Sequence, residues 1–282
     1  MYKRLVPPVA AAILILAAAC VPIGKNNEEA KGAVMLHADR KYDVGIEAGM
    51  ISGGPAEQNE KQEGSLSEHT DSGEAVLLTL SDVMAMADDP QAVEAERAFY
   101  KGTLFIGDSR TVGMRQYSGM DTAEYFCATG MSSFNVMTEK ADTSLGKVDL
   151  PTLLSKASFD RIFIMLGINE LGYNRTKIAE KLVEVVARVR ELQPKAAIYL
   201  EANMHVTSAR SQKDAIYNNV NLNEINAVIK GIANENGLAY IDVNPLFDDA
   251  DGSLNAEYTF DHTHVLGKYY KAWSMWLYKQ CS

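Results

Sequence analysis

Short apolar runs alternate with helical patterns along residues 103–282. The runs are rich in aliphatic and aromatic side chains, as in strands that are buried on both faces. They lie at 104–106, 125–128, 161–166, 197–201 and 238–243. Strands that alternate with helices predict a parallel sheet of five strands with helices on both faces, which is a three-layer α/β/α domain.

Helical periodicity is clearest at 177–192 and 219–234. Gly237 follows the second pattern and is expected to stop that helix. The apolar positions that share one face of the first helix are Ile178, Leu182, Val185, Val186 and Val189.

Two flanking regions add further helices. A last helix is expected at 268–279, with Trp273 and Trp276 in the core. Upstream, Ser81 can cap one helix, and Pro90 can start another.

A targeting segment precedes these patterns. Lys3 and Arg4 form a positive region, and the apolar stretch 9–19 is too short to span a bilayer comfortably. The small residues before Cys20 resemble a bacterial lipobox, after which the cysteine becomes the lipidated first residue, although alanine stands where leucine is commonest. We predict a signal peptide over 1–20 and a membrane-tethered lipoprotein at the cell surface. A plain signal peptide of a secreted protein and an uncleaved anchor are the alternatives, and all three export the chain.

The net charge of −10 is unevenly distributed. Residues 21–97 contain 6 Lys or Arg and 16 Asp or Glu, whereas residues 98–282 contain 19 and 21. The acidic, Gly- and Ser-rich stretch 21–75 cannot bury enough apolar surface to fold alone, so we predict a flexible linker there. The domain then covers 76–282, with its catalytic core at 100–282. The nearly neutral core lacks the basic face of a nucleic-acid-binding protein.

The cysteines beyond Cys20 do not have the spacing of metal ligands. Cys127 lies in an apolar run, where a buried, inert thiol is expected. A disulfide between Cys127 and Cys281 is open to an exported protein, and the sequence does not decide it.

The residues that suggest chemistry follow predicted strands or lie near the C-terminus. Ser109, in Gly107-Asp108-Ser109, follows the first strand, at a strand-to-helix turn where a nucleophile can be exposed. A serine hydroxyl needs a base, for which His264 is the candidate, and Asp261 can orient that imidazole. The oxyanion formed by attack needs fixed donors. We assign these to the backbone N–H groups of Ser109 and Gly130 and to the side-chain amide of Asn169.

These motifs resemble, in order, the four blocks of the SGNH (GDSL-type) hydrolase family. The blocks are Gly107-Asp108-Ser109, Gly130, Gly167-Ile168-Asn169-Glu170 and Asp261-x-x-His264, within residues 100–282. The resemblance implies a flavodoxin-like fold, the site roles given above, no cofactor, and hydrolysis of carboxylic esters, often acetyl groups on carbohydrates. The family usually has aspartate where this chain has Glu170, a difference expected to affect substrate shape more than catalysis.

Taken singly, each of these residues has a structural alternative. Ser109 could cap a helix, and Gly130 and Asn169 could serve in turns. His262 and His264 lie two residues apart and could bind a metal with Asp261, but the other histidines form no further ligand cluster, so we predict no metal. Arg110 could bind substrate or pair with a carboxylate.

The combined pattern predicts an exported serine esterase that hydrolyses short acyl esters, above all acetyl esters, on carbohydrate or cell-envelope polysaccharide. One alternative is an acyltransferase that uses the same serine to pass the acyl group to a sugar hydroxyl. Another is a non-catalytic surface lipoprotein that binds glycan. The sequence does not reveal the oligomeric state.

Overall fold

A computed structural model describes residues 78–282 of the chain. The predicted signal peptide, the predicted lipidation site Cys20 and the predicted linker lie outside the described residues. The helices are α1 (Leu80–Asp88), α2 (Pro90–Tyr100), α3 (Ser109–Tyr117), α4 (Leu150–Lys156), α5 (Arg175–Leu192), α6 (Ser208–Ser211), α7 (Asn219–Asn236), α8 (Asn244–Phe247) and α9 (Tyr270–Cys281), with the 3-10 turns η1 (Ile168–Glu170), η2 (Ala256–Tyr258) and η3 (Gly267–Tyr269).

The main sheet has five strands in the order β2-β1-β5-β6-β7, and every neighbouring pair is parallel. This is the strand order of flavodoxin-like doubly wound folds. The prediction of a five-stranded parallel sheet is therefore confirmed. The strands are β1 (Thr103–Gly107), β2 (Glu124–Cys127), β5 (Arg161–Met165), β6 (Ala197–Glu201) and β7 (Ala239–Ile241).

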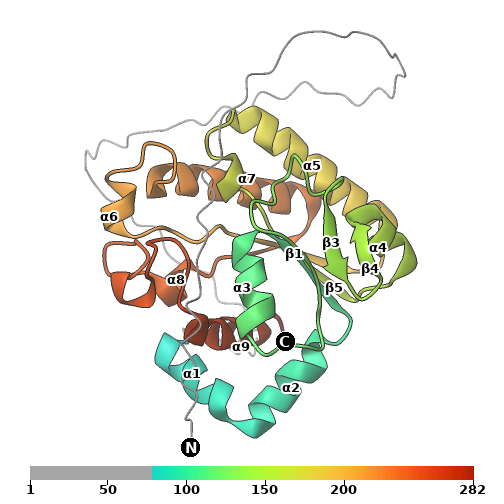
Figure 1. The fold of residues 1–282 in the computed structure, drawn as a ribbon, viewed down its shortest axis with the longest axis horizontal. Coiled ribbons are helices and arrows are strands. Elements are labelled where there is room, and N and C mark those ends of the chain that lie inside the picture. The colour runs from blue at the N-terminus through green and yellow to red at the C-terminus, as the bar shows by residue number, and fades with distance from the viewer. Residues whose placement is uncertain (1–77) are drawn as a thin grey trace, which may run out of the picture. The chain divides into compact units, whose positions relative to one another are not determined.

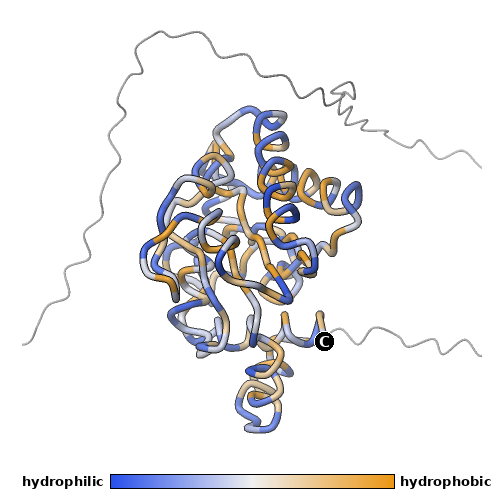
Figure 2. Tube along the Cα trace, turned by 90° about the vertical axis from the view of Figure 1, so that its right-hand side faces the viewer, coloured by the Kyte–Doolittle hydropathy of each residue, from blue (hydrophilic) through white to orange (hydrophobic). Residues whose placement is uncertain are grey.

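Helices cover both faces of this sheet, so the three predicted layers are present (Figure 1). Helices α4, α5 and α7 supply one buried apolar cluster, and the predicted apolar face of α5 packs within it. Helices α1, α2, α3 and α9 contribute to the second cluster on the other face. Trp273 and Trp276, only 1% and 8% exposed, belong to this second core as predicted. Each helix that covers the sheet carries both hydrophilic and hydrophobic positions (Figure 2), as expected of helices with one face in the core.

Of the two helix ends predicted at Gly237 and Ser81, the structure confirms the first and corrects the second. Gly237 ends α7 in the left-handed conformation with φ of 61°, as expected of a helix stop. Ser81 is not the cap of α1, because Thr79 holds that position. The Thr79 hydroxyl accepts from the Asp82 N–H, while the Asp82 carboxylate accepts from the Thr79 N–H. This reciprocal pair satisfies two groups at once, which a cap at Ser81 could not do.

A small antiparallel hairpin was not predicted. It consists of β3 (Lys140–Thr143) and β4 (Gly146–Asp149) and leads directly into α4, which also escaped prediction. Its strands are short and largely exposed, so they carry little of the apolar signal that marks a buried strand.

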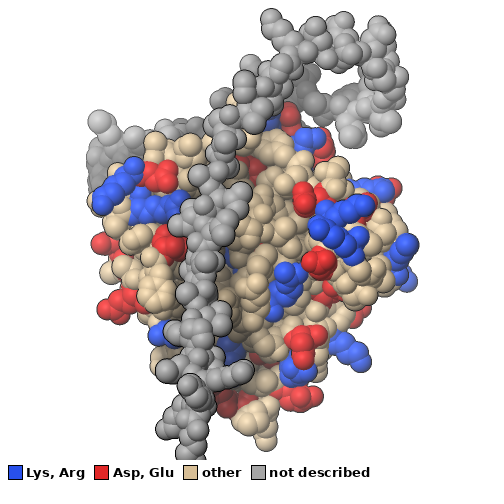
Figure 3. Space-filling view, in the orientation of Figure 1, with Lys and Arg blue, Asp and Glu red and all other residues tan. Residues whose placement is uncertain are grey.

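Cys127 and Cys281 are both free, so no disulfide joins them. Cys127 is buried, as expected of a structural thiol. Among the described residues, no helix combines the length and the hydropathy needed to cross a membrane. Lys, Arg, Asp and Glu are intermixed over the part of the surface visible in Figure 3.

Candidate active site

Ser109 is the first residue of α3, directly after the carboxyl end of β1. The Asp108 carboxylate caps this helix by accepting from the Arg110 N–H at 2.9 Å. Gly107 allows the tight turn, because a Cβ there would lie 2.1 Å from the Thr111 hydroxyl oxygen and 2.8 Å from the Met165 carbonyl oxygen. The serine is half-buried, at the sheet edge where sites form in doubly wound folds.

The loop before η3 holds Asp261 and His264 through local hydrogen bonds. Asp261 Oδ1 accepts from the backbone N–H groups of Thr263 at 2.9 Å and of His264 at 2.8 Å. Asp261 Oδ2 lies 2.6 Å from His264 Nδ1. A bridge between Thr259 and Val265 closes the loop around these residues. The carboxylate and the imidazole are therefore fixed by the same short segment.

The structure brings this loop to Ser109, 155 residues away in sequence. Ser109 Oγ lies 2.7 Å from His264 Nε2. Because the Asp261 carboxylate can only accept, His264 Nδ1 carries the proton, and Nε2 is left to accept from the serine hydroxyl. Both side chains are accessible, with 35% of His264 and 56% of Asp261 exposed. Ser109, His264 and Asp261 thus form a continuous chain of hydrogen bonds that reaches solvent.

Electrostatics keep Asp261 ionised in this arrangement. Partial burial alone would raise the pKa of Asp261, but hydrogen bonds from the His264 ring and backbone and from the Thr263 N–H together hold it well below its ordinary value. An ionised Asp261 can orient the imidazole and stabilise the imidazolium that forms when the ring takes a proton.

Gly130 and Asn169 lie on the two loops that flank Ser109, after β2 and β5. Gly130 has φ of 79° in a turn closed by the Met131 N–H and the Ala128 carbonyl. Only glycine adopts this conformation readily. The Asn169 side-chain N–H₂ donates to the Met131 carbonyl at 2.8 Å, which ties the two loops together and leaves its second hydrogen free to donate.

Glu170 makes a second link between the same loops, which the sequence did not indicate. Its Oε1 accepts from the Ser133 N–H at 2.5 Å, and the side chain is fully buried. Burial raises the pKa of Glu170, while the hydrogen bonds from Ser133 oppose that change. The residue does not face solvent, so it acts on the shape of the loop after β2 rather than as a contact to substrate. No periodicity or motif could reveal a contact with Ser133, 37 residues away.

The turn that carries Asn169 is itself supported by Asn203, in the segment that follows β6. Gly167 has φ of 137°, and a Cβ there would lie 2.6 Å from Asn203 Nδ2. Asn203 accepts from the Ile168 N–H at 2.9 Å and donates to the Leu166 carbonyl at 3.0 Å. The glycine is thus required both by its backbone conformation and by the close approach of Asn203.

The structure also answers the open questions on His262 and Arg110. His262 has φ of 67°, unusual for a residue other than glycine, and its Nδ1 lies 3.0 Å from the Thr207 hydroxyl. Its ring takes no part in the hydrogen bonds that join Ser109, His264 and Asp261. Arg110 is 1% exposed and donates to the Met204 carbonyl at 2.9 Å, so it does not reach substrate. Burial lowers its pKa, which the nearby Asp108 carboxylate partly offsets.

Two further features bear on ligands. Within residues 78–282, no three His, Cys, Asp or Glu side chains gather closely enough to hold a metal ion.

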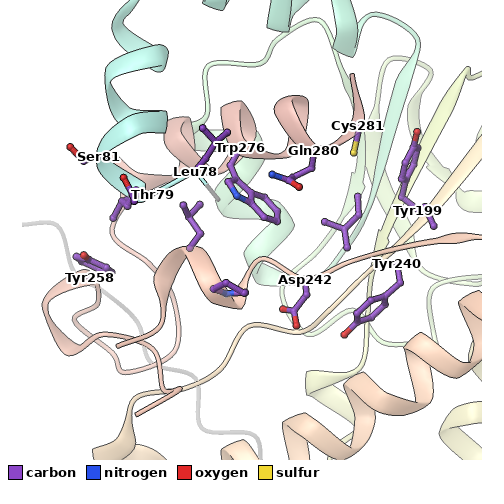
Figure 4. Close-up of a pocket in the computed structure, with 15 residues that line it drawn as sticks. Leu78, Thr79, Ser81, Tyr199, Tyr240, Asp242, Tyr258, Trp276, Gln280 and Cys281 are labelled. Atoms are coloured by element: carbon purple, nitrogen blue, oxygen red, sulfur yellow. The ribbon is translucent and has the colours of Figure 1, made fainter. Parts of the chain in front are cut away.

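A cavity of about 780 Å³ lies between α1, α9 and β7, lined among others by Trp276, Asp242 and Tyr258 (Figure 4). Neither Ser109 nor His264 lines it. The cavity is therefore separate from the hydrogen-bonded chain.

Solved structures share this fold at low sequence identity. A structure described as a candidate platelet activating factor from Streptococcus pneumonia is 19% identical, with a TM-score of 0.50 over 67% of this chain and 92% of that one. A GDSL-like lipase from Bacteroides thetaiotaomicron is 14% identical, with a TM-score of 0.49 over 69% and 97%. A mutant of an acetyl-xylooligosaccharide esterase from Geobacillus Stearmophilus is 17% identical, with a TM-score of 0.43 over 62% and 91%.

Comparison with curated sequences found no match. A sequence model of the GDSL-like Lipase/Acylhydrolase family matches residues 105–272, which is more than half of the chain. That stretch contains Ser109, Gly130, Asn169, Asp261 and His264. The chain therefore belongs to the GDSL-like lipase/acylhydrolase family of esterase-type hydrolases.

Proposed function

We propose that this protein is an exported serine esterase that removes short acyl groups, above all acetyl groups, from carbohydrate or cell-envelope polysaccharide. The observation that carries the proposal is the 2.7 Å contact between Ser109 Oγ and His264 Nε2, with His264 held in turn by Asp261. A hydroxyl in contact with an oriented, neutral imidazole is what acyl transfer through a serine requires.

In the first half of the reaction, His264 Nε2 takes the hydroxyl proton as Ser109 Oγ attacks the ester carbonyl carbon. The carbonyl oxygen becomes an oxyanion, which accepts hydrogen bonds from the Ser109 and Gly130 N–H groups and the Asn169 amide. As the C–O bond to the alcohol breaks, the imidazolium gives its proton to the leaving oxygen. The alcohol departs, and the acyl group stays on Ser109 as an ester.

In the second half, water replaces the alcohol. His264 takes a proton from the water, whose oxygen attacks the acyl carbon, and the same donors stabilise the second oxyanion. Collapse breaks the bond to Ser109 Oγ, and the proton on His264 returns to the serine oxygen. A carboxylic acid leaves, and no cofactor or metal enters the sequence of steps.

The surroundings of His264 support a polar alcohol as the leaving group. An open basin of about 480 Å³ adjoins the loop that carries Asp261 and His262, and its walls include Arg210, Lys213 and Asp214. Arg210 also donates to the Thr263 hydroxyl, so the basin and the loop share a contact. Charged and hydrogen-bonding walls suit a hydroxyl-rich molecule better than a lipid. The choice of carbohydrate also rests on family analogy.

Export is the part of the proposal that depends on the N-terminal sequence alone. The positive region, the short apolar stretch and Cys20 support a signal peptide with lipidation, which would tether the enzyme to the outer face of the membrane. Palmitate labelling of cells that express the full chain would detect the lipid, and Cys20→Ala should abolish it. Labelling that persists in this variant would exclude Cys20 as the attachment site.

The esterase activity is tested with two measurements on the full chain. A serine-directed fluorophosphonate should label the wild type and not Ser109→Ala. A panel of aryl acetate, butyrate and octanoate esters, with acetylated xylan and acetylated peptidoglycan beside it, should show the fastest turnover on acetate and release acetate from at least one polysaccharide.

Other outcomes would point to the alternatives. Acetate release that requires an added sugar acceptor would indicate an acyltransferase. Failure of both labelling and turnover would leave a glycan-binding lipoprotein. Faster cleavage of octanoate than of acetate would overturn the assignment of a short acyl group.

A further inference from the structure

Two exposed aromatic side chains lie on the loops that carry the proposed oxyanion donors. Phe134 is 39% exposed and Tyr173 is 63% exposed. Their ring centroids lie 5.1 Å apart, with the ring planes inclined at 47°. Contact between two partly exposed rings from distant parts of the sequence creates a local apolar surface, which a soluble domain tends to use in binding.

These rings belong to the same two loops as the oxyanion donors. Phe134 lies four residues after Gly130, and Tyr173 lies four residues after Asn169. The hydrogen bonds from Asn169 to the Met131 carbonyl and from the Ser133 N–H to Glu170 join the loops between the donors and the rings. These links hold the loops of the aromatic pair and of the proposed oxyanion donors together.

A third apolar group extends this surface. Ile216, on the segment after β6, is 43% exposed and lies against the loop that carries Tyr173, since a Cβ on Gly172 would be 3.7 Å from its Cδ1. The same segment carries Arg210, Lys213 and Asp214, which line the polar basin. An apolar surface and a polar basin thus adjoin along the rim of the site.

We propose that Phe134 and Tyr173 form a stacking subsite for a sugar ring of the ester substrate, an inference that rests on the proposed carbohydrate esterase function. The C–H bonds on one face of a pyranose present a weakly positive, apolar surface, which fits the negative face of an aromatic ring. An acetyl group ends one methyl beyond the carbonyl carbon and cannot extend along these rings. Because both rings are partly exposed, a ligand on them keeps one side in water, which suits a sugar better than a long acyl chain.

The experiment compares substrates with and without a sugar. Tyr173→Ala and Phe134→Ala remove one ring each, Tyr173→Phe keeps the ring, and Leu145→Ala removes an exposed apolar side chain (43% exposed) from the remote β3–β4 turn. Each variant is assayed on an aryl acetate and on acetylated xylo-oligosaccharides. Both alanine variants should lose about 10-fold in kcat/KM on the oligosaccharide, mainly through KM, because stacking on one ring contributes roughly that factor. Their loss on the aryl acetate should be much smaller, and Tyr173→Phe and Leu145→Ala should match the wild type.

A binding measurement separates this inference from the proposed function. Titration of unacetylated xylo-oligosaccharide into Ser109→Ala, with and without Tyr173→Ala, reports the subsite without any turnover. Weaker binding in the double variant would support the subsite even if no polysaccharide proved to be a substrate. Equal losses on the aryl acetate and the oligosaccharide would mean that the rings only hold the oxyanion loops, and the subsite would be refuted. An aryl octanoate is assayed beside these substrates, and losses confined to it would refute the sugar subsite and assign the rings to an acyl chain.

Discussion

The described part of the chain contains two pairs of histidine and aspartate that are chemically alike and differently used. In one, His264 Nδ1 lies 2.6 Å from an Asp261 oxygen. In the other, His205 Nδ1 lies 2.8 Å from an Asp248 oxygen. A carboxylate fixes the imidazole in both cases, so this contact alone does not distinguish a candidate catalytic pair from a structural one.

The two pairs differ in the partner of the second ring nitrogen and in access. His264 Nε2 faces the Ser109 hydroxyl, which can give up a proton. His205 Nε2 lies 2.8 Å from the Asn223 side-chain oxygen, which can only accept. The side chains of His205 and Asp248 are 11% and 13% exposed, about a quarter to a third as much as those of the other pair.

These surroundings have opposite consequences for the proton. Between two acceptors, His205 satisfies both only when both ring nitrogens carry hydrogen. Burial alone would lower the pKa of His205, but Asp248 and Asn223 outweigh it and raise the pKa above the ordinary value. A histidine whose surroundings favour its charged form is a poor base. The carboxylate at Nδ1 is common to both pairs, so the candidate base is distinguished by the partner of Nε2, which for His264 is a hydroxyl that can give up its proton.

Replacing each histidine in turn should separate the two roles. We expect Ser109→Ala and His264→Ala each to lower kcat by about 10⁴-fold or more, because both groups act in the same step. His205→Gln should change kcat on an aryl acetate by less than about three-fold, because His205 touches neither Ser109 nor its partners. Steady-state kinetics on folded variants, checked by circular dichroism, measures this. A large loss in His205→Gln with its fold intact would contradict the division of roles.

Replacing Asp261 and Asp248 should give a smaller difference in kcat than replacing the two histidines. Asp261→Asn should reduce kcat, but less than Ser109→Ala does, if its role is to orient the imidazole and stabilise its charged form. Asp248→Ala should leave kcat nearly unchanged and lower the free energy of unfolding by about 3 kcal/mol, because it leaves a buried charge without its partner. Urea denaturation beside the kinetic assay separates the two effects. Loss of activity without loss of stability in Asp248→Ala would refute the structural role.

Much of the candidate active site could be predicted from the sequence, because its residues are marked by their spacing along the chain. The strands that precede Ser109 and Asn169 are short apolar runs. Residues that follow such strands lie at the carboxyl edge of a parallel sheet by topology alone. Asp261 and His264 are three residues apart, so their pairing is local. These features depend on spacing, which a single sequence displays.

Other features depend on contacts between residues far apart in the chain, which the sequence does not indicate. Nothing near His205 indicates that it meets Asp248, 43 residues later. The link from Glu170 to Ser133 and the contact of Phe134 with Tyr173 likewise join separate loops. The β3–β4 hairpin was missed for a different reason, because its polar, exposed strands lack the alternation expected of a half-buried strand.

The pH dependence of activity should also distinguish His264 from His205. Because the pKa of Asp261 is held well below its ordinary value, that carboxylate stays ionised from pH 5 to 8. An imidazole that carries both protons cannot accept the serine proton, so activity should fall towards acid pH. His205→Gln should keep this acid limb in a profile of kcat/KM from pH 5 to 8. A flat profile would count against His264 as the base.

Stability should respond to pH in the opposite direction. The raised pKa of His205 means that its charged form stabilises the protein below the ordinary histidine pKa, and that this contribution is lost as the pH rises through the higher folded value. The fall in Tm caused by His205→Gln should therefore be larger at pH 6 than at pH 9. An equal fall at both values would show that ionisation of His205 contributes nothing.

The smallest effect is expected at His262, the histidine nearest to the candidate base in sequence. Its backbone has φ of 67°, a conformation that asparagine tolerates better than most residues, and its ring contacts Thr207 rather than Ser109. His262→Asn should keep kcat within a few-fold of the wild type, and any change should appear in KM for sugar esters, because His262 borders the polar basin. Kinetics on an aryl acetate and an acetylated oligosaccharide distinguish these cases. Near-total loss on both substrates would make His262 the base and reverse the assignment of the two histidines, since only one of them can accept the serine proton.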